Sequence, residues 1–264
     1  MLRRELEYFF GAVRFFTRLP VPAWVGHSSE ALNRSARYFP AVGLLIGGIG
    51  ALVYLGAALL WPPAVAILLS MAATIYATGA FHEDGLADTV DGLGGGWEKL
   101  RILEIMKDSR VGSYGVVAMV LALLGKFTLL CALEPALVPL VLLAGHSLSR
   151  FCSTVLLATM EYVREDLLAK AKPLATGLSG GAVLVALLAP LAALSLLPPE
   201  KVLAGSVLAA LATLWLAGKF KRWLGGYTGD CLGAVQQVSE IAFYLGVLAV
   251  WGRSVGSGLA AAFS

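Results

Sequence analysis

The chain has 264 residues, of which 58% are hydrophobic and only 14% are charged. Soluble domains carry about a quarter charged residues, so a water-facing globule is excluded and lipid must cover much of the surface. The net charge of +3 is too small for a nucleic-acid partner, which needs a dense basic patch. We expect an all-α, polytopic transmembrane helix bundle surrounded by the lipid bilayer.

The N-terminal segment, residues 1–39, combines charges with apolar residues at helical spacing. Its first 18 residues contain six charged side chains, which leaves no uninterrupted apolar stretch for a signal peptide. Leu2, Leu6, Phe9, Phe10 and Val13 recur on one helical face, with charges on the other. This pattern predicts an amphipathic helix that lies in the membrane interface.

Seven apolar segments follow, each close to the roughly 20 residues that a bilayer-spanning helix needs. The sixth is the shortest, and prolines punctuate several of the connections. We predict one integral membrane domain over 1–264, with a bundle over 40–251 and spans at 40–61, 63–82, 112–133, 136–160, 179–197, 202–217 and 231–251.

Lysine and arginine set the expected orientation, because cytoplasmic loops keep the excess. The N-terminal segment and the loops 83–110, 161–178 and 218–230 hold sixteen of them, against two on the opposite side. The sequence therefore places these segments in the cytoplasm, and with seven spans it places the C-terminus outside.

An acidic stretch begins where the second span reaches the cytoplasm. Asp84, Asp88 and Asp91 are spaced i, i+4 and i+7, so on a helix they share one face. Carboxylates held so close repel one another unless a cation joins them. Mg²⁺ prefers oxygen ligands and keeps waters that a phosphate can displace, so this face predicts a Mg²⁺ site rather than a solvated helix end.

Two further cytoplasmic patches leave alternatives open. Lys107 and Arg110 precede the third span and suit either phosphate binding or positive-inside anchoring. Thr228 and Asp230 follow a pair of glycines before the seventh span. Asp230 suits either a fourth carboxylate of the metal site or an N-cap.

Ionisable residues also occur within the spans, where they are costly and face a partner or a cavity. Lys126, Arg150 and Glu240 fall at similar depth, and His146 lies one turn from Arg150. A buried Lys–Glu or Arg–Glu pair is expected, and we favour a polar cavity over a simple helix lock. A cytoplasmic metal site at the mouth of such a cavity suits transfer at a phosphorus centre.

Several long motifs, in order over residues 14–245, resemble the cobalamin synthase family, also called adenosylcobinamide-GDP ribazoletransferases. They are the stretches 16–22, 39–43, 81–88, 103–110, 149–150 and 225–234. One departure is visible, because Asp166 is followed by Leu167 where the family tends to have an acid and then glycine.

The resemblance implies a Mg²⁺-dependent enzyme of the bacterial inner membrane that completes cobalamin. α-Ribazole, or its 5′-phosphate, would displace GMP from adenosylcobinamide-GDP. Oligomerisation and contacts with other cobalamin-assembly enzymes stay open.

The same resemblance implies a role for each candidate site residue. Asp84, Asp88, Asp91 and Asp230 would hold the metal or act as base. The residues that would bind substrate are Lys107, Arg110, Thr228, Arg18, Arg150 and Glu240.

Two alternatives remain at this point. A CDP-alcohol phosphotransferase has an arginine where Asp88 stands and a wider aspartate spacing. In a transporter, Lys126, Arg150 and Glu240 would line a path for the substrate or for protons. Many transporters are built from internal repeats, and no such repeat is visible in this sequence.

Overall fold

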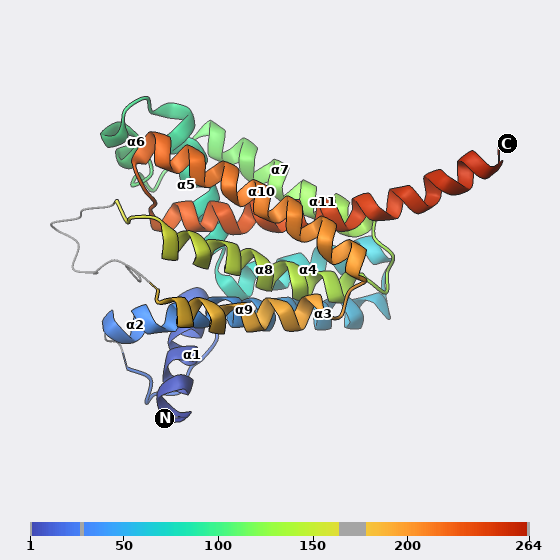
Figure 1. Ribbon diagram of the computed structural model, residues 1–264, viewed down its shortest axis with the longest axis horizontal. Helices are drawn as coiled ribbons and strands as arrows, with labels where there is room; N and C mark the ends of the chain where they lie inside the picture. Colours follow the sequence, from blue (N-terminus) through green and yellow to red (C-terminus); the bar gives the residue numbers. More distant parts are fainter. Residues whose placement is uncertain (1, 27–28, 164–177, 263–264) are drawn as a thin grey trace.

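The computed structural model describes residues 2–26, 29–163 and 178–262. Within them the chain folds into α-helices and one 3-10 helix, packed as an elongated bundle (Figure 1). The elements are α1 (Leu2–Phe16), α2 (Ser29–Ser35), η1 (Ala36–Tyr38), α3 (Phe39–Ala58), α4 (Pro63–Thr78), α5 (Phe81–Gly95), α6 (Lys99–Ile105), α7 (Ser113–Cys131), α8 (Val138–Thr159), α9 (Gly180–Leu194), α10 (Pro199–Leu224) and α11 (Gly229–Ala262).

The expected all-α, polytopic fold is confirmed, with a lower count of clear spans. In the described part of the chain, five helical stretches are long and apolar enough to cross a membrane. The pair α4 and α5 adds a sixth if it counts as one bent span. α9, expected as the fifth of seven spans, has 15 residues and a length of about 22 Å, which is short of the roughly 30 Å hydrocarbon layer.

The boundary predicted for the second span is wrong. The helix expected over 63–82 ends at Thr78, and the chain turns by 85° before α5 begins at Phe81. Gly79 ends α4 in the left-handed conformation, with φ of 66°, where glycine has no steric cost. The sixth predicted span, expected to be short, is the 26-residue helix α10.

Small residues let the central helices approach closely. A Cβ atom at Gly47 of α3 would lie 2.7 Å from the carbonyl oxygen of Leu142 on α8, and Gly43 meets the same helix at His146. Lipid supplies no hydrophobic drive for helix association, so such close backbone packing provides much of the attraction. The α3–α8 contact is therefore a main joint of the bundle.

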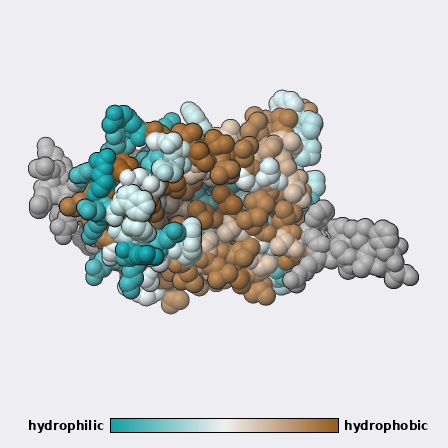
Figure 2. All heavy atoms as spheres, turned by 90° about the horizontal axis from the view of Figure 1, so that it is seen from above, coloured by the Kyte–Doolittle hydropathy of each residue, from teal (hydrophilic) through white to brown (hydrophobic). Residues whose placement is uncertain are grey.

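The charged segments gather at one end of the bundle. Helices α1, α2 and α6 lie at this end (Figure 1), and Figure 2 shows hydrophilic side chains there and a hydrophobic belt over most of the remaining length. The segregation inferred from the lysine and arginine count is confirmed for these segments. That this end faces the cytoplasm stays a prediction.

The N-terminal helix forms as expected, although part of the predicted apolar face points outward. Val13 and Phe16 of α1 are buried against the bundle, whereas Leu2 is 75% and Leu6 is 42% exposed. Exposed leucines beside charged residues suit a helix at a lipid surface. Its interfacial position stays a prediction.

We predict that Gly47→Ala lowers the free energy of unfolding by about 1–3 kcal/mol, because the new methyl group meets backbone. The matched control is Gly56→Ala in the same helix, where an added Cβ has no neighbour within 4 Å. The control should be neutral or stabilising by up to about 1 kcal/mol. Thermal unfolding in detergent measures both, and equal melting temperatures would contradict the proposed α3–α8 joint.

Candidate active site at the charged end of the bundle

The acidic helix α5 is directed across the bundle by the bend before it. Gly79 and Ala80 both have positive φ, 66° and 59°, and a non-glycine residue in this conformation costs about 1–2 kcal/mol. The Arg18 N–H donates to the Ala77 carbonyl at 2.8 Å, and a Cβ atom at Gly79 would collide with the Arg18 guanidinium. Arg18, a predicted substrate-binding residue, therefore packs on the bend that directs α5.

Two glycines bring α5 against the first turns of α11. A Cβ atom at Gly85 would lie 3.0 Å from the Asp230 carbonyl oxygen, and one at Gly233 would lie 3.2 Å from the Gly85 Cα. A side chain at either position would crowd the backbone of the facing helix, so glycine suits this close approach. Since Asp84 precedes Gly85 and Asp88 lies one turn on, this crossing joins two carboxylate-bearing segments that are about 140 residues apart in sequence.

Asp91 makes a different set of contacts from the other aspartates. It is buried, and its two carboxylate oxygens accept hydrogen bonds from the Gly112 N–H at 2.7 Å and the Gly115 N–H at 2.9 Å. These amides belong to the start of α7, so Asp91 caps that helix and also complements its dipole. Its role as a metal ligand stays a prediction.

Thr228 forms the N-cap of α11. Its Oγ1 accepts from the Cys231 N–H at 3.3 Å and donates to Asp230 Oδ2 at 3.4 Å, and the residue is fully buried. Just before it, Tyr227 pairs with residues 161–163 through backbone hydrogen bonds of 2.9 and 3.0 Å. Of the two roles open for Asp230, the side-chain cap is thus taken by Thr228, and Asp230 stays a candidate ligand.

Arg110 is paired with a neighbouring carboxylate. Its Nη2 and Nε donate to Asp108 Oδ2 and Oδ1 at 2.7 and 3.0 Å, in a two-pronged contact. This contact lowers the pKa of Asp108 to about 2, so the pair is ionised throughout the neutral range. Arg110 and Asp108 line an open hollow of about 440 Å³ that also borders Asp91, whereas Lys107 lies on the exposed surface.

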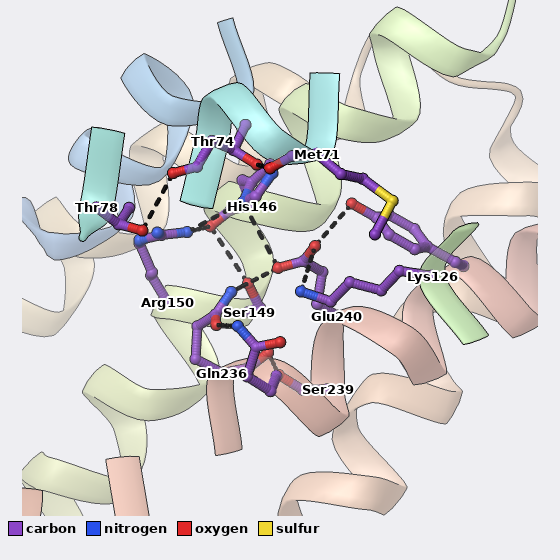
Figure 3. A network of polar contacts seen from close by, with 12 residues as sticks. Met71, Thr74, Thr78, Lys126, His146, Ser149, Arg150, Gln236, Ser239 and Glu240 are labelled. Atoms are coloured by element: carbon purple, nitrogen blue, oxygen red, sulfur yellow. Dashed lines mark hydrogen bonds and ion pairs between the residues drawn. The ribbon is translucent and has the colours of Figure 1, made fainter. Parts of the chain in front are cut away.

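A second polar cluster lies inside the bundle, formed by side chains from α4, α7, α8 and α11 (Figure 3). Glu240 Oε1 lies 3.1 Å from Lys126 Nζ and accepts from the Tyr244 hydroxyl at 3.0 Å, while Glu240 Oε2 lies 3.5 Å from His146 Nδ1. The predicted Lys–Glu pair is therefore confirmed. Arg150 is also buried and donates to the His146 carbonyl at 3.0 Å.

The space left among these residues is small. The cavity that Arg150 and Glu240 line has a volume of about 20 Å³, which is room for about one water molecule. Two basic and two acidic side chains, Lys126 and Arg150 with Glu83 and Glu240, balance one another there. The structure thus places Arg150 and Glu240 in a buried polar nest around a small cavity, and their contact with substrate stays a prediction.

Glu83 and Gln237 are residues to which the sequence analysis gave no role in the site. Gln237 Nε2 donates to Glu83 Oε1 at 3.0 Å and to Gln236 Oε1 at 2.8 Å, and Gln236 in turn donates to Glu240. This chain connects the acidic helix to the nest. The signal available in the sequence was the position of Glu83, which directly precedes Asp84 and therefore lies about 100° around the helix, outside the acid face.

The carboxylates do not form a closed metal cage. Among residues 2–26, 29–163 and 178–262, no three His, Cys, Asp or Glu side chains are grouped closely enough to hold a metal ion. Mg²⁺ usually binds through one or two carboxylates together with substrate phosphates. Any one or two of Asp84, Asp88 and Asp230, which belong to the segments that meet at the glycine crossing, would satisfy that smaller requirement.

Comparison with known proteins identifies the family of the chain. A sequence profile of the cobalamin-5-phosphate synthase family matches residues 8–248. The chain belongs to this family. It is 48% identical over 260 residues to an adenosylcobinamide-GDP ribazoletransferase of Shewanella amazonensis, covering 96% of this chain and 98% of the relative.

Two further relatives carry the same name. One from Vibrio cholerae is 47% identical over 94% of this chain and 96% of its own length, and one from a Polaromonas species is 47% identical over 89% and 94%. No solved structure matches the chain. The expectation of a cobalamin-biosynthesis transferase is confirmed, and the phosphotransferase and transporter alternatives are set aside. The departure at Asp166 and Leu167 lies outside the described residues.

We predict that Asp91→Ala destabilises the protein by about 1–2 kcal/mol in the absence of Mg²⁺, because two amides of α7 lose their acceptor. Asp84→Ala is the matched control on the same helix. Asp84 is exposed, so its loss should change stability by less than about 0.5 kcal/mol. Thermal unfolding without added metal separates the two, and an equal effect would argue against the cap.

Proposed function

We propose that this protein joins α-ribazole, or its 5′-phosphate, to adenosylcobinamide-GDP and releases GMP. The ribazole hydroxyl would lose its proton and form a new P–O bond at the phosphate attached to cobinamide, while the P–O bond to GMP breaks. The products would be adenosylcobalamin, or its 5′-phosphate, together with GMP. The names of the relatives support this reaction.

The observation that carries the proposal is the glycine crossing. Gly85 and Gly233 let α5 meet the start of α11 on the side next to its acidic face, so carboxylates from both helices can address one substrate at the charged end. Asp84, Asp88 and Asp230 are proposed to hold Mg²⁺ against the substrate diphosphate. When bound there, the ion would neutralise phosphate charge and stabilise the departing GMP.

The chain's own residues would orient the substrate. Arg110 would exchange the Asp108 carboxylate for phosphate oxygens, which offer its fork the same two-pronged geometry. Asp230 lies in the first turn of α11, and it would accept the proton of the attacking hydroxyl if it is not a ligand. Thr228, as the N-cap of α11, and Asp91, through its bonds to the start of α7, would hold the site-bearing segments in place.

We also propose that the site faces the cytoplasm of a bacterial inner membrane. The basic residues that mark the cytoplasmic side of membrane proteins lie at the same end as the acidic helix. A charged nucleotide substrate is accessible only at such a surface. The bundle interior, with a cavity of about 20 Å³, offers it no room.

We predict that Asp88→Ala lowers GMP release by roughly 10²-fold or more, because a charge-stabilising group at the reacting phosphate is lost. The assay uses purified protein in lipid, adenosylcobinamide-GDP and α-ribazole 5′-phosphate, with and without Mg²⁺. Glu200→Ala, at the opposite end of the bundle on α10, is the matched control and should keep wild-type turnover. Retained, Mg²⁺-dependent turnover in Asp88→Ala would remove Asp88 from the site.

We further predict that Asp108→Asn lowers the KM for adenosylcobinamide-GDP by up to about fivefold, because a weak, solvent-screened ion pair no longer competes for Arg110. Arg110→Lys should raise the same KM. The pKa of Asp108 is held at about 2, so this competition persists above about pH 4 and disappears only as the pH falls through 2. The KM difference between wild type and Asp108→Asn should thus stay constant from pH 6 to pH 8. An unchanged KM in Asp108→Asn would rule out the exchange.

A further inference from the structure

An apolar groove runs along the side of the bundle between α7 and α10. Its volume is about 460 Å³, and α5 and α11 form its floor. Leu86 and Ala234 on the floor are buried, as is Ala122 on the α7 wall, whereas Leu121 and Trp215 on the rims are 65% and 59% exposed. The groove therefore opens sideways, through the hydrophobic belt of the bundle. Figure 2 shows this belt from the side that carries α7 and α10.

The length of the groove matches one leaflet of a bilayer. Along α7 it extends from Tyr114, at the charged end, to Ala122. Eight residues of helix correspond to about 12 Å, close to half of the roughly 30 Å hydrocarbon thickness. A chain entering at the charged end would reach about the middle of the membrane.

The charged end of the groove carries groups suited to a lipid headgroup. Lys219 lies there with its Nζ 5.0 Å from the ring centroid of Trp215, and Tyr114 lies on the opposite rim. Tryptophan and tyrosine are typical of the headgroup level, and basic pockets between spans bind anionic headgroups. Lys221 lies about 200° further around the same helix and faces away from the groove.

We propose that this groove is a binding site for an anionic phospholipid, with one acyl chain between α7 and α10 and the phosphate at Lys219. The groove lies on the side of α5 opposite to Asp84 and Asp88, so the site is separate from the proposed reaction. A bound acyl chain would pack beneath Leu86 and Leu93 and support the acidic helix from behind.

The test is native mass spectrometry of protein extracted from vesicles made of equal parts phosphatidylglycerol and phosphatidylcholine. Wild type should retain phosphatidylglycerol. Ala118→Phe fills the groove from α7 and should abolish retention, whereas Lys219→Glu should lower retention of phosphatidylglycerol by about fivefold or more. The lysine lies on the exposed surface, so this variant remains informative if Ala118→Phe fails to fold.

Two matched controls make the outcome decisive. Val120→Phe adds apolar bulk to an exposed position of α7 outside the groove, and Lys221→Glu makes the same charge change on the other side of α10. Both should retain lipid as wild type does. Equal retention in all four variants would overturn the site, and so would displacement of the lipid by adenosylcobinamide-GDP. Retention of both lipids without preference would overturn the anionic headgroup.

Discussion

The structure depends on one constraint, which is that the acidic helix must leave the hydrocarbon layer while it stays packed against the spans. Carboxylates are costly at bilayer depth, so the chain turns by 85° after Thr78 and α5 crosses the charged end of the bundle. The turn uses two left-handed residues, and Gly85 and Gly233 then allow α5 to contact α11 at backbone distance. The bend and the crossing together determine where the candidate metal ligands Asp84, Asp88 and Asp230 lie.

Behind this crossing, a buried polar nest fixes the position of the same helix. Glu83 points inward and bonds to Gln237, which is connected through Gln236 to Glu240 and Lys126. Removing one partner of such a buried pair costs about 3–5 kcal/mol, so the nest holds α5, α7, α8 and α11 in one arrangement. The nest has room for about one water molecule, and its hydrogen bonds and ion pairs join these helices to one another.

Much of the fold and part of the site could be predicted from the sequence. Hydropathy and the lysine and arginine count located the helices and the charged end, because these features follow from the bilayer alone. The bend at Gly79 was missed because a hydropathy window averages the polarity of side chains and carries no information on the backbone angle φ that ends the helix. The spacing of Asp84, Asp88 and Asp91 correctly placed them on one helix. It could not show that the Asp91 carboxylate accepts hydrogen bonds from the backbone amides of Gly112 and Gly115. Such partners depend on tertiary contacts.

The central claim is that carboxylates from α5 and α11 act together at their crossing. The most direct test is electron paramagnetic resonance of Mn²⁺, standing in for Mg²⁺, bound to the protein with adenosylcobinamide-GDP in lipid. Our account predicts a bound-Mn²⁺ signal in wild type that is lost in both Asp88→Ala and Asp230→Ala. A bound signal that survives unchanged in both variants would contradict a metal site shared by these two helices.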